Sequence, residues 1–329
     1  MRYAFLAVWC LTFMARPFPL LAADADYDPL KVEATPPSEP LDLTITDAAR
    51  KRDIPLRIYL PTDNKPAPVV MFSHGLGGSR EMSPFIGRHW AGRGYVAVFL
   101  QHPGSDTSVW KGKPLGERMP AMHAAASGEN FMLRVKDVPA VLDDLTRRNK
   151  DQGDPLFGRL DMEHIGMSGH SFGAITTQAV SGQIAARGRI SLTEPRIKAA
   201  IIMSPSTPKQ GDPAQAFSSV KIPWLLMTGT KDLSLIGGAD MKSRLGVYPA
   251  LPAGEKYELV LHNAEHSAFT DRALPGEKEK RNPNHHKAML ALSTAFWDAY
   301  LKDDAAAKTW LDGDGAKQVL EAEDRWQRK

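Results

Sequence analysis

The chain has 329 residues, and 43% of them are hydrophobic, which is enough apolar surface for a packed core and argues against disorder. Its 41 lysines and arginines nearly balance its 38 aspartates and glutamates. Because no basic run stands out, a nucleic-acid partner is not expected.

The first residues are predicted to form an export signal. Arg2 supplies a short positive region, an apolar run covers 3–15, and Ala22 and Ala23 offer small residues for cleavage. The run is too short to cross a bilayer, and an N-terminal membrane anchor is the alternative interpretation. We therefore expect a signal peptide over residues 1–23, a periplasmic or secreted bacterial protein, and no stable membrane anchor after cleavage.

The only cysteine, Cys10, falls inside this predicted signal. Trp9 precedes it, where a lipoprotein cleavage site requires a small residue, so lipidation is not expected. Cleavage near Ala23 would leave a chain without thiols or disulfides, which suits an exported protein that does not depend on them.

The next stretch, 24–40, contains "ATPPSEP" and is predicted to be a proline-rich segment outside the core. Residues 41–329 are expected to form one domain. It opens with two β-rich runs, 41–47 and 54–61, which are separated by the polar "AARKR". This pattern predicts a β-hairpin.

From Pro68 onward, short apolar runs alternate with longer helical stretches. The runs are almost continuously apolar, which indicates strands covered on both faces. The predicted strands are 68–73, 95–100, 164–168, 199–204, 224–229 and 256–262. The alternation predicts an α/β domain with a mostly parallel, doubly wound sheet, an N-terminal β-hairpin and helices on both faces.

Three long helices are predicted between and after these strands. The first is expected over 79–90, with Ser79 at its start. The second contains Pro139, so it either kinks there or starts near Asp137. The third has a start signal at Asn282-Pro283. The apolar stripe of the second helix is Phe131, Val135, Val138, Leu142 and Leu145.

A glycine-flanked serine lies between a predicted strand and a helix, in the stretch "IGMSGHSFGA". Its G-x-S-x-G core is the nucleophile-elbow pattern, in which Gly169 and Gly173 let the strand and helix backbones pass close together. Ser171 would then stand at the carboxyl end of the sheet, above a helix N-terminus. The alternative is an ordinary glycine-rich turn.

A serine nucleophile needs a base and an acid that orients the base. The expected chain order is serine, then acid, then histidine, each on a loop after a later strand. Asp232 in "GTKD" and His266 in "NAEHSAFTD" follow the fifth and sixth predicted strands at that spacing. Asp240 is the rival acid and His262 the rival base.

Acyl transfer also requires donors for the oxyanion. One donor is expected to be the backbone N–H of Phe172, directly after the serine. The other is expected from Leu76, in the glycine-rich loop "MFSHGLGGSRE" that follows the first parallel strand. The alternative for this loop is a simple glycine turn into the next helix.

A long loop is predicted over 104–130, carrying Trp110, Met119 and Met122. We expect it to shape an apolar pocket for the acyl or alcohol group of a substrate. The alternative is a surface excursion whose apolar side chains simply pack down. The pair His285-His286 is expected to face solvent, and no metal or cofactor is expected because the histidines lack ligand-like spacing.

Five stretches together resemble the α/β-hydrolase superfamily, in the branch of dienelactone-hydrolase-like esterases and platelet-activating-factor acetylhydrolases. They are "FSHGLGGSR", "GYVAVFLQHPGSD", "RVKDVPAVLDDL", "GHSFGA" and "HSAFTD", spread from residue 68 to about 300. The resemblance implies the α/β-hydrolase fold and esterase chemistry through an acyl-enzyme.

The chain departs from these relatives in two respects. The acetylhydrolases carry the acid after the strand that directly follows the nucleophile, where this chain has Ser204. Asp232 stands one strand later, as in dienelactone hydrolases and cutinases. Dienelactone hydrolases themselves usually use a cysteine nucleophile, which the predicted mature chain lacks.

The expected function is therefore that of a serine carboxylic-ester hydrolase acting on small or short-chain esters. With the same triad, a phospholipid or polyester substrate is the alternative. A hydrolase-fold binding protein without catalysis is the alternative of another class.

Overall fold

The structure is a computed structural model that describes residues 27–32, 39–185 and 190–329. The predicted signal peptide over 1–23, Cys10 included, lies outside the described residues. Within them, no helix combines the length and the apolar composition needed to span a membrane.

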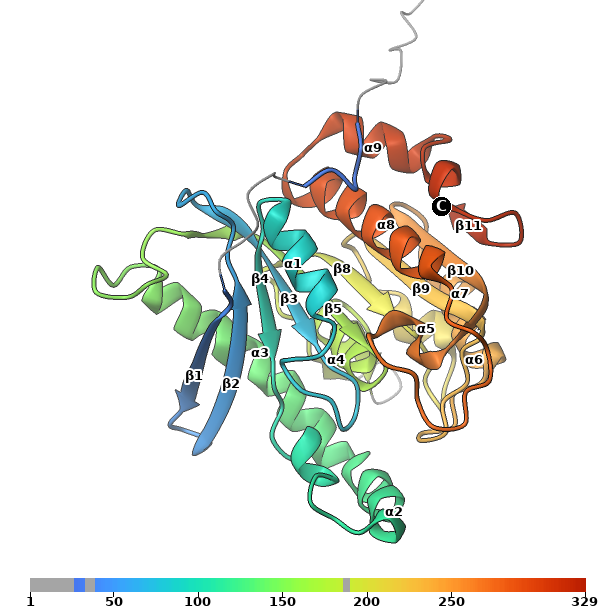
Figure 1. Ribbon diagram of the computed structural model, residues 1–329, viewed down its shortest axis with the longest axis horizontal. Coiled ribbons are helices and arrows are strands. Elements are labelled where there is room, and N and C mark those ends of the chain that lie inside the picture. Colours follow the sequence, from blue (N-terminus) through green and yellow to red (C-terminus); the bar gives the residue numbers. More distant parts are fainter. Residues whose placement is uncertain (1–26, 33–38, 186–189) are drawn as a thin grey trace, which may run out of the picture.

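The described residues form a nine-stranded sheet with helices on both faces (Figure 1). Six central strands pair in parallel, and β1, β2 and β11 extend the two edges in antiparallel fashion. This confirms the predicted mostly parallel sheet with an N-terminal hairpin. In spatial order the strands are β1 (Leu41–Asp47), β2 (Arg52–Tyr59), β4 (Val96–Leu100), β3 (Ala67–Ser73), β5 (Leu160–His170), β8 (Ile197–Met203), β9 (Trp224–Lys231), β10 (Lys256–Glu265) and β11 (Arg325–Arg328).

The helices divide between the two faces of the sheet. One face packs against α1 (Pro84–Gly92) and α8 (Pro283–Leu301), with α9 (Ala305–Asp312) behind α8. The other packs against α3 (Gly128–Arg148), α4 (Phe172–Val180) and the short α5 (Pro213–Phe217), α6 (Met241–Leu245) and α7 (Val247–Ala250). The remaining elements are α2 (Leu115–Ala125), the short strands β6 (Ile184–Ala185) and β7 (Ile190–Ser191), and 3₁₀ turns at Thr107–Val109, His266–Phe269 and Ala316–Val319.

The sheet has an apolar core on each of its two faces because side chains alternate between the faces along each strand. On β3, Val70 and Phe72 join the cluster under α1 and α8, whereas Val69 and Met71 join the cluster under α3. All four side chains are buried, as the nearly continuous apolar run in the sequence predicts for a strand covered on both faces.

The strand order has a switch point between β3 and β5. The chain leaves β3 through α1 on one face, returns as β4, and then crosses to β5, which continues into α4 on the opposite face. Connections that leave neighbouring strands toward opposite faces open a binding crevice at the carboxyl ends of those strands. The loops after β3 and β5 therefore meet at this point.

Helix α1 begins later than predicted, at Pro84 instead of Ser79. Ser83 has φ 56°, in the left-handed region, so a right-handed helix cannot run through it. Residues 79–83 therefore belong to the turn that follows the glycine-rich loop.

Helix α3 begins earlier than the start near Asp137 that Pro139 suggested. The side chain of Ser127 accepts a hydrogen bond from the Asn130 N–H and caps a helix that begins at Gly128. Pro139 lies inside this single helix, and the predicted apolar stripe does face the sheet.

The predicted loop over 104–130 contains the 3₁₀ turn Thr107–Val109 and the whole of α2. Pro120 lies inside α2, and only Ala125 of the helix is buried, so the sequence shows little helical pattern there. The C-terminal α9 and β11 are also absent from the sequence prediction.

The start of α8 agrees with the sequence, since the Asn282 side chain caps the helix and Pro283 occupies its first turn. The solvent-facing prediction for the histidine pair is wrong. The His285 ring is buried and its Nε2–H donates to the His262 carbonyl at 3.0 Å, while the His286 ring stacks on Phe85. These contacts hold both rings against other segments of the same domain.

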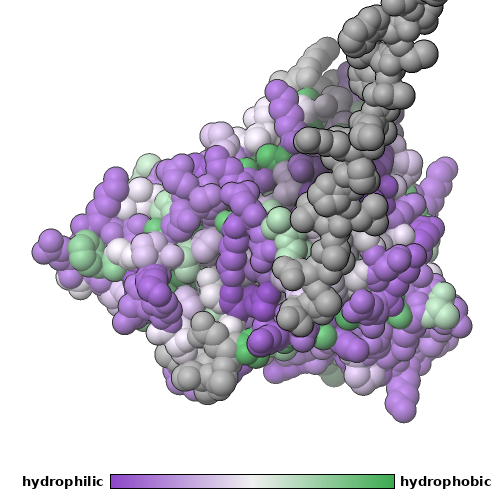
Figure 2. Space-filling model, turned by 90° about the horizontal axis from the view of Figure 1, so that it is seen from above, coloured by the Kyte–Doolittle hydropathy of each residue, from purple (hydrophilic) through white to green (hydrophobic). Residues whose placement is uncertain are grey.

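The first described segment, 27–32, lies against the helices of the α1 and α8 face. The Tyr27 hydroxyl donates to Asp298 at 2.8 Å, and Arg93 donates to the Lys31 carbonyl at 2.7 Å. Seen from above in Figure 2, the uncovered part of this end of the molecule is mainly hydrophilic, with small separate hydrophobic spots.

Candidate active site

Ser171 stands at the sharp junction between β5 and α4. Its φ of 58° and ψ of −113° are unfavourable for a residue with a side chain. A Cβ built on Gly169 would lie 2.4 Å from the Gly173 carbonyl oxygen, and one built on Gly173 would lie 1.8 Å from the Ser73 carbonyl oxygen. Only glycine fits at either position, so the predicted reason for the flanking glycines is confirmed.

The structure brings Ser171, His266 and Asp232 into one chain of contacts. The His266 Nε2 lies 2.9 Å from the Ser171 Oγ, and its Nδ1 lies 2.6 Å from the Asp232 Oδ1. Because an ionised carboxylate can only accept, Nδ1 carries the proton. Nε2 is then free to accept the proton of the serine hydroxyl.

Asp232 is fully buried, and its charge is well satisfied. The Thr228 hydroxyl donates to its Oδ2 at 2.8 Å, and the Arg244 Nε lies 3.4 Å from its Oδ1. Burial alone would raise the pKa of Asp232, but the hydrogen bond and charge of His266 and the charge of Arg244 hold it below its usual range. The carboxylate therefore stays ionised at neutral pH.

Arg244 was not identified from the sequence. Its guanidinium, on α6, donates to the carbonyl oxygens of Ser204 and Pro205 at 2.7 and 3.0 Å, and lies 3.4 Å from the His266 Nδ1. It thus joins the loop after β8 to the acid and the histidine. Single-sequence reasoning offers no signal for such a residue, because the contact depends on the packing of α6 against the ends of two strands.

The rival acid and base lie elsewhere. The Asp240 side chain accepts the Ser243 N–H at 2.8 Å and caps α6. His262 is exposed, and its backbone carbonyl accepts the hydrogen bond from the His285 ring. Neither side chain has a contact with Ser171.

His170, the residue before Ser171, packs against His266. Its ring centroid lies 4.7 Å from that of His266, and its Nε2–H donates to the His266 carbonyl at 2.9 Å. Burial, followed by the charge of His266, lowers the pKa of His170 to about 3. A neutral ring therefore packs against His266 at neutral pH. Although His170 lies within the quoted motif, its contact was not predicted.

The loop after β3 reaches the serine. A Cβ built on Gly75 would lie 3.4 Å from the Ser171 Cβ. Within the described residues, neither the Leu76 N–H nor the Phe172 N–H donates to a protein acceptor. Two free backbone donors are therefore present on the two segments that meet at Ser171, as an oxyanion hole requires.

The Leu76 loop is fastened on its outer side. The Gly77 N–H donates to the Ser105 carbonyl at 2.8 Å, and the Gly77 carbonyl accepts from the Trp110 indole N–H at 2.8 Å. A Cβ on Gly77 would lie 2.6 Å from the Met122 Cε. Two of the three predicted pocket residues, Trp110 and Met122, therefore pack on this loop.

Met119, the third predicted pocket residue, lies on the exposed side of α2 and is 45% exposed. The amphipathic face of α2 was not readable from the sequence, so Met119 and Met122 could not be separated there. Within the part of the chain that the structure describes, no three His, Cys, Asp or Glu side chains are placed to hold a metal ion.

Two family models match adjacent parts of the chain. The model described as PET hydrolase-like matches residues 126–279, a range that includes Ser171, Asp232 and His266. The model described as platelet-activating factor acetylhydrolase, isoform II, matches residues 48–123, which include the Leu76 loop. The chain is an α/β hydrolase of the esterase branch.

In general terms, this α/β hydrolase is a serine ester hydrolase, since both matching families act on esters. The family assignment agrees with the resemblance found in the sequence. No relative among curated proteins matches the chain.

Proposed function

We propose that the chain hydrolyses carboxylic esters with Ser171 as nucleophile, His266 as general base and Asp232 as the acid that orients the histidine. The observation that carries the proposal is the continuous contact from the Ser171 Oγ through the His266 ring to Asp232, at 2.9 and 2.6 Å. It lies at the carboxyl end of β5, at the switch point of the strand order where such sheets bind ligands.

In the first step, His266 Nε2 takes the hydroxyl proton as the Ser171 Oγ attacks the ester carbonyl carbon. The tetrahedral oxyanion accepts hydrogen bonds from the Leu76 and Phe172 N–H groups. The carbon–oxygen bond to the alcohol then breaks, and the leaving alkoxide takes the proton from His266. The result is a free alcohol and an acyl ester of Ser171.

In the second step, His266 takes a proton from water, and the hydroxide attacks the acyl carbon. The same two N–H groups hold the second oxyanion. Collapse returns the proton to the Ser171 Oγ and releases the carboxylic acid. The ester, water and these side chains supply every atom and proton, so the steps require neither a metal nor a cofactor.

Small or short-chain esters are the proposed substrates. Trp110 and Met122, two of the apolar residues expected to shape the substrate pocket, pack on the Leu76 loop that carries a proposed oxyanion donor. A polyester is the second candidate, supported by the PET hydrolase-like match across all three triad residues. A phospholipid acyl ester is the third, supported by the match to platelet-activating factor acetylhydrolase over 48–123.

The test of the chemistry is Ser171→Ala, with hydrolysis of p-nitrophenyl acetate as the measurement. We expect kcat to fall by about 10⁴–10⁶ while the circular dichroism spectrum and Tm are retained. The matched control is Ser218→Ala, an exposed serine at the C-cap of α5, which should keep wild-type turnover. Wild-type turnover in Ser171→Ala would overturn the proposal.

The test of the substrate compares three forms of ester with the same purified enzyme: p-nitrophenyl acetate in solution, phospholipid vesicles and a polyester film. Small esters as the substrate predict the highest kcat/KM on the soluble compound and little release from vesicles or film. Faster release from the film or the vesicles than from the soluble ester would replace this candidate with the corresponding alternative.

We also propose that the protein is exported, on the strength of the N-terminal pattern alone. N-terminal sequencing of protein expressed in a bacterial host should give a chain that starts near Asp24 and is found in the periplasm or medium. A full-length chain with Met1 in the cytoplasm would contradict this.

A further inference from the structure

Arg134, on α3, is a buried cation for which the proposed mechanism has no use. Its side chain is fully buried, and among the described residues no carboxylate forms an ion pair with it. Burial lowers the pKa of Arg134 to about 9, so the guanidinium remains charged at neutral pH. A buried charge without a counter-ion costs several kcal/mol unless its donors are used.

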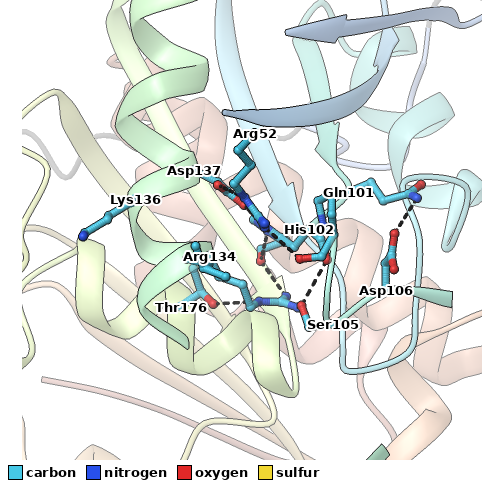
Figure 3. Close-up of polar contacts among 12 residues, drawn as sticks. Arg52, Gln101, His102, Ser105, Asp106, Arg134, Lys136, Asp137 and Thr176 are labelled. Atoms are coloured by element: carbon cyan, nitrogen blue, oxygen red, sulfur yellow. Dashed lines mark hydrogen bonds and ion pairs between the residues drawn. The ribbon is translucent and has the colours of Figure 1, made fainter. Parts of the chain in front are cut away.

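Every hydrogen bond that Arg134 donates ends on a hydroxyl or carbonyl oxygen, and Figure 3 shows those to Ser105 and Thr176. Nη2 donates to the Ser73 hydroxyl at 3.0 Å and to the His74 carbonyl. Nη1 donates to the Ser105 hydroxyl at 2.9 Å, and Nε donates to the Thr176 hydroxyl at 3.2 Å. One planar guanidinium therefore joins three segments: the end of β3, the loop after β4, and α4.

Two of these segments carry the proposed oxyanion donors, and the third fastens one of them. Leu76 is two residues beyond His74, and Ser105 receives the Gly77 N–H from the same loop. On the other side, Thr176 donates from its hydroxyl to the Phe172 carbonyl at 3.0 Å. The Arg134 Cζ also lies 4.7 Å from the centroid of the Phe172 ring.

We propose that Arg134 is a positioning residue that fixes the Leu76 and Phe172 N–H groups relative to each other, and so sets the geometry of the oxyanion hole. The inference rests on the proposed esterase function. Both donors must point at one oxygen atom, yet they belong to segments separated by about a hundred residues of chain. The Arg134 guanidinium, a planar group that donates hydrogen bonds to both segments, meets that requirement.

The Ser73 hydroxyl, one of the acceptors of Arg134, is itself held in place by His102. The His102 Nδ1–H donates to the Asp137 Oδ2 at 2.9 Å, so its Nε2 accepts a hydrogen bond from the Ser73 hydroxyl at 2.9 Å. Burial, followed by the charge of Arg134, lowers the pKa of His102 to about 4, which keeps this ring neutral. The Ser73 Oγ is thus left as an acceptor for Arg134.

Asp137 forms no ion pair with Arg134 among the described residues, although both project from α3 and the charge of Asp137 raises the pKa of Arg134. The Asp137 Oδ1 accepts hydrogen bonds from Arg50 and Arg52, each at 2.8 Å. A purely structural role for the cluster would require that Arg134 only join α3 to the sheet. The two roles differ in what they predict for the oxyanion, because only the positioning role makes catalysis depend on where the two N–H groups point.

The experiment uses Arg134→Lys, which keeps the charge and loses the planar fork. We expect kcat for p-nitrophenyl acetate to fall at least 10-fold with KM changed less than 3-fold. The second readout is the ratio of kcat/KM for the ester to that for its thiono analogue, in which sulfur replaces the carbonyl oxygen. A well-set hole discriminates against the larger sulfur, so the ratio should fall in Arg134→Lys by at least 5-fold.

Two milder variants keep the inference testable if Arg134→Lys does not fold. Ser105→Ala and Thr176→Val each remove one acceptor of the guanidinium, and each should lower kcat about 2- to 10-fold and reduce the thiono discrimination. The matched control is Arg147→Lys, an exposed position on the same helix, which should leave both readouts unchanged.

Wild-type kcat and unchanged thiono discrimination in Arg134→Lys, or in both milder variants, would overturn the inference. A loss of Tm with an unchanged ratio would also overturn it, because that result belongs to a purely structural role. Since Ser171→Ala tests the esterase function separately, an active enzyme with an indifferent Arg134 would leave the proposed function standing.

Discussion

At the scale of single residues, Asp232 shows how much the candidate site depends on its immediate neighbours. It is an acceptor for His266 and Thr228, with Arg244 beside it, and all of these contacts are buried. These contacts hold the carboxylate in one orientation. It dictates that His266 keeps its proton on Nδ1 and offers Nε2 to Ser171.

This arrangement predicts the effect of Asp232→Asn. The amide can donate to Nδ1, which would favour the wrong tautomer of His266 and leave no base facing Ser171. We expect kcat for p-nitrophenyl acetate to fall by about 10³–10⁴ with little change in KM. Steady-state kinetics check the prediction.

The matched control is Asp240→Asn, which keeps a capping side chain at the start of α6 and changes no residue in contact with Ser171. It should keep kcat within about 2-fold of wild type. If Asp240→Asn lost activity and Asp232→Asn kept it, the acid would be assigned to the wrong aspartate.

The sequence identified the residues whose positions depend on the chain order of the fold, and missed those whose positions depend on packing. Ser171, Asp232 and His266 each follow a recognisable strand, so their meeting could be predicted. Arg134 and Arg244 act across segments that are distant in sequence. Nothing in the spacing of either arginine distinguishes it from a solvent-exposed charge.

At the scale of elements, the elbow between β5 and α4 requires β3 and α4 to lie almost in contact. Only glycine fits at position 173, because a Cβ there would come within 1.8 Å of the Ser73 carbonyl oxygen. Ser73 in turn belongs to the hydrogen-bonded chain that reaches Arg134. Packing of the two elements and the geometry of the site are therefore coupled.

Gly173→Ala should consequently push α4 away from β3. We expect the free energy of unfolding to fall by at least about 2 kcal/mol, because neither backbone can yield without breaking its own hydrogen bonds. Urea unfolding followed by fluorescence measures the change.

Gly116→Ala is the matched control, because a Cβ on Gly116 would meet no atom within 4 Å. This residue lies in α2, where alanine favours the helix, so the control should be neutral or slightly stabilising. A Gly173→Ala variant as stable as Gly116→Ala would contradict the packing account.

Element boundaries were predicted well where capping or apolar runs determine them, and poorly where the backbone conformation does. The start of α8 follows from its cap Asn282. The start of α1 depends on the left-handed Ser83, a conformation that its residue type does not announce. Helix α2 lacks an apolar stripe because most of it is exposed, and β11 is recognised only through its pairing with β10.

At the scale of the whole molecule, buried histidines, His74, His102 and His170 among them, link stability to pH. Burial lowers the pKa of His74, His102 and His170, to about 4 for His102 and about 3 for His170. Their unfolded value is near 6.5. Between pH 6.5 and about 4 the unfolded chain therefore binds protons that the folded chain does not, and stability falls as the pH falls.

Asp232 acts in a lower window. Its folded pKa lies below its unfolded value, so its stabilisation is complete above about pH 4 and is lost only in stronger acid. The loss of stability between pH 6.5 and 4 should accordingly come from the histidines. Each contributes roughly 1.4 kcal/mol per pH unit inside its window.

Urea unfolding at pH 5, 6, 7 and 8 measures this dependence. We expect the free energy of unfolding to be nearly constant from pH 8 to 7 and to fall increasingly below pH 6.5. His102→Gln should reduce the slope between pH 6 and 5 by roughly 1.4 kcal/mol per pH unit, whatever its effect on absolute stability. An unchanged slope in that variant, or a flat profile down to pH 5, would contradict the account.

The overall architecture could be predicted because the periodicity of apolar runs is a property of the sequence itself. The mostly parallel sheet, its hairpin and its two helical faces all follow from that pattern. The switch point between β3 and β5 arises from the spatial order of strands, which periodicity does not encode.

The most direct test of the central claim is covalent labelling of Ser171. A fluorophosphonate probe reacts with a serine only when a neighbouring base activates it and the phosphoryl oxygen has donors to receive it. After incubation with excess probe, intact-mass spectrometry followed by peptide mapping should find one adduct per chain, on Ser171. The adduct should be absent from Ser171→Ala and form at least 100-fold more slowly in His266→Ala. An unlabelled wild-type enzyme, or an adduct on another residue, would contradict the account.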